Sequence, residues 1–498
     1  MITLPLSTGS MTSHPASYSY PRPNLRIYNS LTRQKEEFKP LNPEQIKMYV
    51  CGVTVYDYCH LGHARAYVVW DMVRRYLQTL YPVRYIQNIT DIDDKILRRA
   101  QEQNITMQKL AERYIAAYNE DMARLNILPA DGYPKATESI PAIITLIEQL
   151  IEKGFAYASG GDVYYAVQHF PGYGKLSGRK LTDMQAGASG RVDETEPHKR
   201  YPFDFALWKG AKSQEPFWES PWGNGRPGWH IECSAMVRSH LGNSIDIHAG
   251  GADLQFPHHE NEIAQSEAAV EQPLAKYWLH NGFVNIDGEK MSKSLQNFTT
   301  IRNLLAVYEP MAVRLFILQA HYRQPIDFTE AAMNAATKGW ETIKEALLFG
   351  RDFGTIAPED FLPDSYTQFH QAMMDDFNTS VAMSYIFELA KELKAERNNL
   401  SHTGKTQRDA AQLGQIWHTL QYMTNILGFA VDYESESNQD ESAAVDDLSV
   451  IVEDLIEQRR LARKSKNFKE SDRIRDELKG MGITLVDQPD GTTRWLKS

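Results

Sequence analysis

The feature that most constrains the fold is a short motif between an apolar run and an amphipathic stretch. The run Ile46–Val55 is rich in β-forming residues. It leads to His60-Leu61-Gly62-His63, which opens a stretch of helical periodicity, Ala64–Leu80. A helix N-terminus has free N–H groups and a partial positive charge, so it attracts phosphates. Gly62 lets a nucleotide approach the backbone, and the two histidines face one side of the first turn. This order of strand, motif and helix predicts a nucleotide phosphate site.

A second motif, Lys290-Met291-Ser292-Lys293-Ser294, follows Gly288 and offers two lysines and two hydroxyls to a polyphosphate. Each motif alone has a simpler explanation: a capped helix with a buried glycine for the first, and a solvated basic turn for the second. Their order and their strand-then-helix setting favour the functional interpretation. Together they predict that the chain binds ATP and that chemistry takes place at its α-phosphate.

Apolar runs that alternate with helical stretches predict the fold class. Tyr85–Thr90, Ile245–His248 and Gly282–Ile286 are strand candidates, and 498 residues give room for roughly three or four domains. The pattern predicts an α/β protein with a Rossmann-type, doubly wound parallel sheet. A Gly- and Pro-rich insertion interrupts this sheet at about 140–223, and an α-helical bundle follows at 336–431.

The C-terminal region combines basic residues with a small hairpin. Nine lysines and arginines crowd a helical segment between Arg459 and Lys479, after an acidic, serine-rich linker. Gly482–Asp487 and Asp490–Trp495 predict a β-hairpin with an Asp-Gly turn, so this unit is expected to be a small α/β domain. The basic segment suggests contacts with phosphates, but a solvated helix face with acid–base pairs at i,i+4 explains it as well.

Composition excludes several classes of protein. No apolar run is long enough to cross a bilayer, and three cysteines indicate a reducing compartment without a disulfide framework. Residues 1–24 are rich in Ser, Thr, Pro and Tyr, lack the apolar core of a secretory signal, and are expected to be a disordered leader. The net charge of −11 does not exclude RNA binding, because such a footprint is local. We expect a cytoplasmic protein with no membrane partner.

Cysteine, histidine and glutamate residues suggest a metal site. Cys51 lies near the end of the first strand, and Cys233, His258 and Glu262 follow far downstream. A helix that begins at Pro257 would place His258 and Glu262 on one face. Two thiolates, one imidazole and one carboxylate can form a tetrahedral Zn²⁺ site. A buried cysteine and a surface His–Glu pair explain the same residues, and no C-x-x-C pair decides between the two interpretations.

Longer segments resemble one enzyme family. The two motifs resemble the HIGH and KMSKS motifs of class I aminoacyl-tRNA synthetases, and the chain resembles cysteinyl-tRNA synthetases from about Leu25 to the C-terminus. The segments that carry this resemblance are Tyr49–Asp57, Asn88–Lys95, Gly228–Met236, Phe256–Glu262 and Asp375–Thr379. Leu61, Ala66 and Gln296 depart from the family pattern but remove no catalytic group.

The resemblance implies the residues of each site. One Zn²⁺ per chain is implied at Cys51, Cys233, His258 and Glu262, where the thiolate of cysteine approaches the metal. ATP, with Mg²⁺, is implied at His60, Gly62, His63, Gly251, Asp253, Lys290 and Lys293. The catalytic residues among these are His60, His63, Lys290 and Lys293. The amino-acid pocket is implied at Gly52, Thr54, Thr90 and Trp229. His230, His259 and Glu260 are expected to support the ligands, and Cys59 to be structural.

The function implied by the resemblance is that of a ligase. The chain is expected to activate L-cysteine to cysteinyl-adenylate, to transfer it to tRNA(Cys), and to act as a monomer. Zinc binds a thiolate better than the hydroxyl of serine, so no separate editing domain is needed. One alternative is a cysteine ligase for an amino sugar, which would lack the C-terminal unit. The other is a non-catalytic, zinc-containing RNA-binding paralogue, which the intact motif residues His60, His63, Lys290 and Lys293 disfavour.

The motifs and the resemblance also predict the domains. They are a leader (1–24), a first catalytic half (25–139), a connective insertion (140–223), a second catalytic half (224–285), a KMSKS loop and stem-contact region (286–335), a helical bundle (336–431), an acidic linker (432–447) and an anticodon-binding domain (448–498). In the last domain, Trp495 either stacks on an anticodon base or caps the core of the domain.

Overall fold

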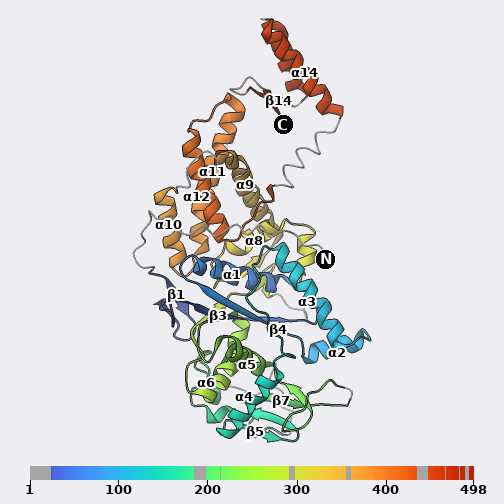
Figure 1. The fold of residues 1–498 in the computed structure, drawn as a ribbon, viewed down its shortest axis with the longest axis vertical. Helices are drawn as coiled ribbons and strands as arrows, with labels where there is room; N and C mark the ends of the chain where they lie inside the picture. Colours follow the sequence, from blue (N-terminus) through green and yellow to red (C-terminus); the bar gives the residue numbers. More distant parts are fainter. Residues whose placement is uncertain are drawn as a thin grey trace. The chain divides into compact units, whose positions relative to one another are not determined.

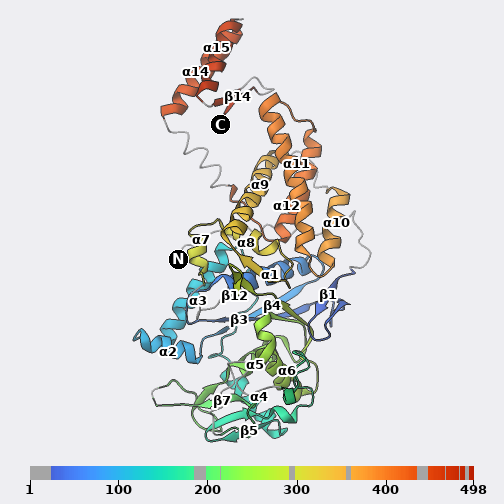
Figure 2. The same ribbon diagram turned by 180° about the vertical axis from the view of Figure 1, so that it is seen from behind.

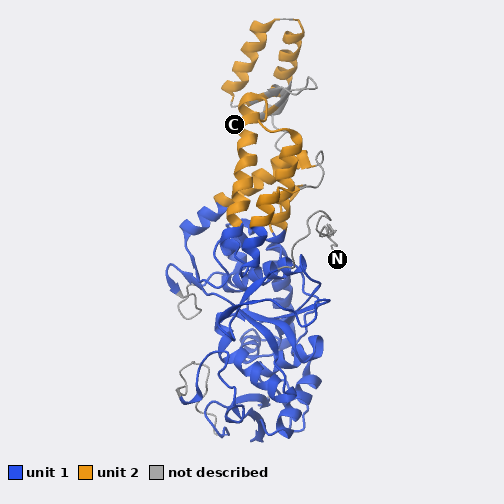
Figure 3. Cartoon of the chain, turned by 90° about the vertical axis from the view of Figure 1, so that its left-hand side faces the viewer, with its two compact units in different colours: residues 1–337, 369–382, 426–428 blue, residues 338–368, 383–425, 429–498 orange. Residues whose placement is uncertain are grey.

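The computed structural model describes residues 24–183, 198–213, 215–290, 298–354, 361–433, 447–465, 467–481, 483–487 and 493–497. Most of the predicted leader, most of the acidic linker and Lys293 lie outside these residues. The chain divides into two compact units (Figure 3). The first consists of residues 1–337, 369–382 and 426–428, and the second of residues 338–368, 383–425 and 429–498.

A four-stranded parallel sheet forms the centre of the first unit (Figure 1). Its strands, in the order β10-β9-β3-β4, are β10 (Ala275–Asn281), β9 (Ile245–Gly251), β3 (Ile46–Thr54) and β4 (Val83–Thr90). Helix α1 (Leu61–Gln78) covers one face and α5 (Trp229–Leu241) the other (Figures 1 and 2). Because helices cover both faces, the strands are buried and largely apolar. The predicted doubly wound parallel sheet is confirmed.

One strand prediction needs correction. Gly282–Ile286 was predicted to belong to the parallel sheet, but β10 takes that place beside β9. The shorter strand β11 (Val284–Ile286) instead joins β12 (Glu289–Lys290) and β13 (Ile326–Phe328) in a separate sheet. Lys276, His280 and Asn281 interrupt the apolar pattern of β10, so its sequence lacks the signal of a buried strand.

The other elements of the first unit surround this sheet. A hairpin of β1 (Arg26–Asn29) and β2 (Gln34–Glu37) precedes it, and α2 (Asp94–Glu102), α3 (Met107–Arg124), α6 (Glu260–Val270), α7 (Ile301–Leu305) and α8 (Pro310–Leu318) flank it. The region of the predicted insertion contains α4 (Ile140–Glu152) and three strands of an antiparallel sheet, β5 (Ala156–Ser159), β6 (Asp162–Tyr165) and β7 (Phe205–Gly210). The fourth strand of this sheet, β8 (Gly225–Pro227), lies just past the predicted end of the insertion at residue 223. Ile143, Ile147 and Leu150 of α4 are fully buried in the core of this part.

The C-terminal half of the chain is mainly helical. The helices that match the predicted bundle are α9 (Glu330–Gly354), α10 (Pro363–Met374), α11 (Thr379–Thr403) and α12 (Ala410–Ile426). In the described part of the chain, none of the helices combines the length and the apolar character needed to span a bilayer.

The last part of the chain has a small core of its own. Its elements are α14 (Asp447–Lys464), α15 (Phe468–Gly480), β14 (Ile483–Asp487) and β15 (Thr493–Lys497). The predicted hairpin is confirmed, since β14 and β15 pair antiparallel. The basic residues, however, lie on two helices and not on one. Arg473 forms an i,i+4 ion pair with Glu477 at 2.7 Å, as the solvated-face interpretation expected, and Arg460 pairs with Glu457 at i,i+3 at 2.6 Å.

A buried ion-pair network fixes α1 inside the first unit. Asp71 of α1 pairs with Arg314 of α8 and with Arg75, whose Nε lies 2.8 Å from Asp71 Oδ2. Arg314 also donates to the carbonyls of Leu427 at 2.6 Å and Leu125 at 3.0 Å. Burial opposes ionisation of Asp71, but the two guanidinium groups outweigh it and hold its pKa below the usual value. The network therefore depends on all three charges.

Arg314→Met should destabilise the first unit, because it leaves the carboxylate of Asp71 buried beside a single cation. We expect the free energy of unfolding, measured by urea titration with tryptophan fluorescence, to fall by about 3–5 kcal/mol. Lys153→Met is the control, since Lys153 forms an exposed pair with Glu271 at 2.9 Å and its loss should have no measurable effect. Equal effects of the two substitutions would contradict the central role of Arg314.

Candidate functional site

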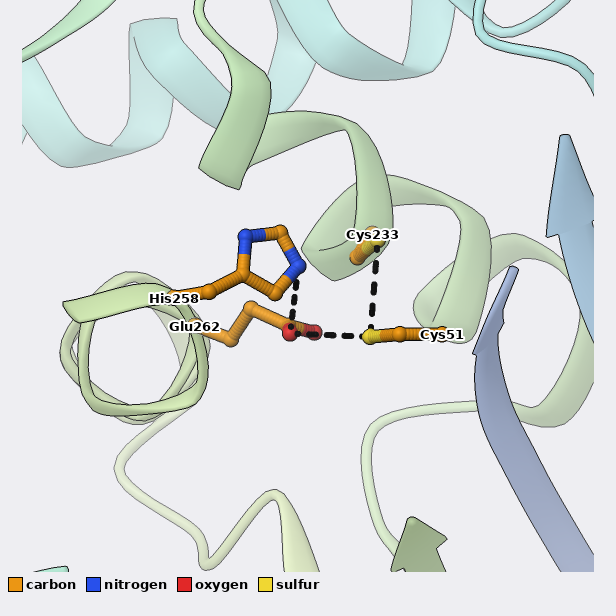
Figure 4. A group of neighbouring side chains, drawn as sticks. All are labelled: Cys51, Cys233, His258 and Glu262. Atoms are coloured by element: carbon orange, nitrogen blue, oxygen red, sulfur yellow. Dashed lines mark hydrogen bonds and ion pairs between the residues drawn. The ribbon is translucent and has the colours of Figure 1, made fainter. Parts of the chain in front are cut away.

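The carboxyl end of β3 provides the first residues of the site. The pairing of β3 with β4 is irregular between Val50 and Val53, where Cys51 and Gly52 lie. Gly52 donates its N–H to Asn88 Oδ1 at 2.8 Å, and a Cβ on Gly52 would come 1.6 Å from the Asn88 carbonyl oxygen. Irregular pairing of this kind redirects side chains beside active sites. Only glycine fits at position 52, and Cys51 is left to face α5 and α6 (Figure 4).

Four buried side chains converge next to this strand end (Figure 4). They are Cys51 of β3, Cys233 of α5, His258 in the turn before α6, and Glu262 of α6. Cys51 Sγ lies 3.9 Å from Cys233 Sγ and 3.5 Å from Glu262 Oε1, which lies 3.1 Å from His258 Nε2. One ligand atom from each residue lies within 4.8 Å of the others. The structure thus brings together all four residues named from the sequence.

The chemistry of this cluster fits a divalent metal ion. Burial raises the pKa of the Cys51 thiol and of the Glu262 carboxyl well above their usual values. Both groups therefore favour their protonated forms. A divalent cation reverses this preference, because it binds the thiolate and the carboxylate. Two sulfur atoms with one nitrogen and one oxygen are a donor set that Zn²⁺ accepts in tetrahedral geometry.

A second donor set overlaps the first. His248 Nε2 lies 2.9 Å from Glu262 Oε2, and His259 Nε2 lies 3.3 Å from Cys51 Sγ. These four residues also have ligand atoms within 4.8 Å of one another. Sequence reasoning gave His259 a supporting role and did not consider a role for His248, which lies between Ile247 and Ala249 in β9. Both sets share Cys51 and Glu262, so a single ion can be bound by only one of the two sets at a time.

Hydrogen bonds to the outer ring nitrogens distinguish the two sets. A metal-bound imidazole almost always holds its second nitrogen in a hydrogen bond. His258 Nδ1 lies 2.9 Å from His230 Nδ1 and meets this condition. His248 Nδ1 is buried without a hydrogen-bond partner among the described residues and does not. His259 Nδ1 is held by His280 Nε2 at 2.9 Å, which orients its ring beside the cluster. The first set is therefore the better metal site.

His60 and His63 cap α1 and hold each other in place. Gly62 donates its N–H to His60 Nδ1, and His60 donates its N–H to His63 Nδ1, both at 3.1 Å. Because each Nδ1 accepts a hydrogen bond, the neutral rings carry their protons on Nε2. The ring centroids lie 3.9 Å apart. Two Nε2–H donors are thus held side by side at the positive end of a helix.

The residues named for the amino-acid pocket lie around the metal cluster. Thr54 and Thr90 are neighbours at the ends of β3 and β4. Thr90 Oγ1 donates to Glu232 Oε2 at 3.2 Å, and the Trp229 ring lies 4.2 Å from the His258 ring. Burial raises the pKa of Glu232 well above its usual value. Sequence reasoning missed Glu232, although it lies next to Cys233.

The structure describes only some of the other residues that were predicted to bind the nucleotide. β9 ends at Gly251, and Asp253 follows in a short helical turn. A Cβ on Gly251 would come 2.5 Å from Asp253 Oδ1, so glycine leaves room for this carboxylate. Lys290 is the last residue of β12, and Lys293 lies outside the described residues.

Three family models match the chain. Residues 37–338 match the tRNA synthetases class I (C) catalytic domain, residues 368–431 the DALR domain, and residues 445–495 the cysteinyl-tRNA ligase anticodon binding domain. The chain is 59% identical to a cysteine--tRNA ligase of Cyanothece sp., over 95% of this chain and 99% of that protein. It is 58% identical to a cysteine--tRNA ligase of Microcystis aeruginosa, again over 95% and 99%.

Solved structures share the fold at low sequence identity. Methionyl-tRNA synthetase of Mycobacterium tuberculosis in complex with methionyl-adenylate has a TM-score of 0.53 at 15% identity, over 77% of this chain and 89% of that one. The ternary complex of Agrobacterium radiobacter LeuRS-tRNA-LeuAMS has a TM-score of 0.53 at 11% identity, over 78% and 84%. The likeness supports the class I fold.

Metal content should separate the two donor sets. Cys233→Ser should remove the bound zinc, because it replaces a thiolate of the first set with a protonated hydroxyl. His259→Gln should still bind about one zinc per chain, with affinity reduced by ~10–100-fold at most, since it removes only a supporting group. Inductively coupled plasma mass spectrometry on the purified variants measures both. Zinc retained by Cys233→Ser and lost by His259→Gln would assign the ion to the second set.

Proposed function

The chain belongs to the cysteinyl-tRNA synthetase family and is a ligase for cysteine and tRNA, and from this we propose a role for each group of the site. The family, the α/β fold class and the ligase activity agree with the sequence predictions. They favour this function over the amino-sugar ligase and over the non-catalytic paralogue. The observation that carries the proposal is the convergence of Cys51, Cys233, His258 and Glu262 on the strand that leads to His60. The domain boundaries given above remain predictions.

The four buried residues would hold one Zn²⁺, which supplies a Lewis acid for the substrate thiolate. Serine differs from cysteine by one atom, and a pocket that used size alone would gain only ~1–3 kcal/mol of selectivity. Thr90 and Trp229 stand beside the cluster and would enclose the amino acid, with Gly52 and Thr54 completing the wall. Binding of the soft sulfur atom of cysteine to the zinc in this pocket would explain how the enzyme discriminates against serine.

Adenylation would take place at the N-terminus of α1. The cysteine carboxylate attacks the α-phosphate of ATP, and pyrophosphate leaves. His60 and His63 can donate from Nε2 to the phosphate oxygens, where negative charge develops. Gly251 and Asp253 would receive the ribose, while Lys290, Lys293 and Mg²⁺ neutralise the polyphosphate.

Transfer would follow when the terminal ribose hydroxyl of tRNA(Cys) attacks the mixed anhydride. The C-terminal unit is proposed to bind the anticodon arm, with its basic helices near the phosphates. Trp495 packs on a core that includes Val452, Ile474 and Leu478, which supports its role as a cap of that core.

The function itself is tested by ATP–pyrophosphate exchange in the presence of cysteine or serine, followed by aminoacylation of tRNA(Cys). Exchange should require cysteine, and the label should then appear on the tRNA. Exchange that serine supports equally well, or cysteine activation without transfer to tRNA(Cys), would contradict the proposal.

His60→Asn should separate the catalytic role of His60 from its capping role. Asparagine is a strong N-cap residue and can accept the Gly62 N–H, but it lacks the Nε2–H that reaches the phosphate. We expect kcat for pyrophosphate exchange to fall on the order of 100-fold. The thermal unfolding midpoint should stay unchanged, whereas His60→Ala should lower it as well. Normal exchange by His60→Asn would show that the imidazole acts only as a cap.

Removal of residues 447–498 should separate the two half-reactions. The C-terminal unit has its own core, so its loss should leave cysteine-dependent exchange near normal. Aminoacylation at low tRNA concentration should fall by more than about tenfold, because phosphate contacts are lost. Equal losses in both assays would point to a structural role, and unchanged aminoacylation would refute tRNA binding by this unit.

A further inference from the structure

The segment that enters α7 runs along the N-cap of α1. Leu61 donates its N–H to the Thr299 carbonyl at 3.0 Å, and Ile301 donates its N–H to the Cys59 carbonyl at 2.8 Å. His60 and Thr300 face each other between these two bonds in an antiparallel bridge. The backbone on both sides of His60 is therefore fastened to residues 299–301. Whatever fixes α7 also fixes the imidazole that caps α1.

Arg302, the next residue, joins α7 to α3. Its Nη2 lies 2.6 Å from Glu120 Oε2 and 3.4 Å from the Ala117 carbonyl oxygen, and its Nε lies 3.2 Å from Asp121 Oδ1. The guanidinium carbon also lies 5.2 Å from the centre of the Tyr58 ring, which precedes His60 by two residues. The Arg302 side chain, which belongs to α7, thus contacts both α3 and the turn that carries His60.

The two carboxylates that meet Arg302 differ in their surroundings. The side chain of Glu120 is 59% exposed, whereas that of Asp121 is fully buried. The Asp121 oxygens accept no aligned hydrogen bond among the described residues, so Arg302 is a partner by charge. Burial raises the pKa of Asp121 to about 6, with Arg302 acting in the opposite direction and Glu120 and Arg124 as the other charged neighbours. Above that pH, the buried charge needs Arg302 beside it.

We propose that Arg302, held by the buried Asp121, is a positioning residue that fixes His60 for adenylation. It acts through the backbone bonds between residues 299–301 and the α1 N-cap. The inference rests on the proposed role of His60 at the phosphate. A reacting group displaced by about 1 Å can lose on the order of 100-fold in rate, so loosening of this anchor should be visible in kinetics.

The chain offers a matched control. Asp121→Asn removes the buried charge while keeping the shape of the side chain, and Arg302→Lys keeps the charge but loses the fork that reaches both carboxylates. Glu120→Gln removes the exposed partner of the same arginine. For Asp121→Asn and Arg302→Lys, kcat of cysteine-dependent exchange should fall by roughly 10–100-fold, with KM for cysteine within about twofold of wild type. Glu120→Gln should behave as wild type in both parameters.

Three outcomes would overturn the inference. The first is normal kcat in both Asp121→Asn and Arg302→Lys, and the second is an equal loss in Glu120→Gln. The third is a rise of KM for cysteine in parallel with the loss of kcat, which indicates general damage to the unit. Binding of a non-hydrolysable ATP analogue is measured for the same proteins. If the wild-type protein binds the analogue but shows no cysteine-dependent exchange, the proposed function is contradicted. In that case analogue binding alone tests the inference: Asp121→Asn and Arg302→Lys should bind the analogue more weakly than the wild type.

Discussion

The buried carboxylate of Glu262 is the group on which the site depends. Its oxygens lie 3.1 Å from His258 Nε2, 3.5 Å from Cys51 Sγ and 2.9 Å from His248 Nε2. It therefore contacts β3, β9 and the turn before α6 at the same time. A buried carboxylate is costly to ionise without a positive partner. A divalent cation would let Glu262 and Cys51 ionise together, so the proposed metal binding, the packing of these segments and the proposed choice of substrate all depend on one cluster.

The same strand connects this cluster to the proposed nucleotide site. Cys51 lies near the end of β3, and the chain then turns through His60 into α1. The histidine cap holds one end of that helix, and the buried ion pairs of Asp71 hold its body. In the proposed reaction the amino acid and the α-phosphate meet within bonding distance. A single strand–helix unit, held at the histidine cap and at Asp71, would satisfy this requirement. The irregular pairing at Gly52 is the local adjustment that turns Cys51 toward the other candidate metal ligands.

Elements with a local signal could be predicted from the sequence. β3, β4 and α1 have apolar runs or a cap motif, and the C-terminal hairpin has alternating residues around an Asp-Gly pair. β10 was missed because its polar residues find partners far away in the chain, as His280 Nδ1 does with Ser30 Oγ at 2.8 Å. His248 was missed for the same reason, since its neighbours in the sequence do not indicate the groups that it meets. Glu232 was missed although it lies next to Cys233, because its partner Thr90 is far away in the chain. Spacing alone left the candidate zinc ligands undecided, and they were named from the resemblance to a family.

X-ray absorption at the zinc edge tests the central claim most directly, because it counts the sulfur atoms bound to the ion. The full-length protein with its native zinc should show about two sulfur ligands, from Cys51 and Cys233, and saturating cysteine should raise the count to about three. Serine at the same concentration should leave the spectrum unchanged. A count of about one sulfur in the free protein, or a spectrum that cysteine does not alter, would contradict selection of the substrate by its thiolate.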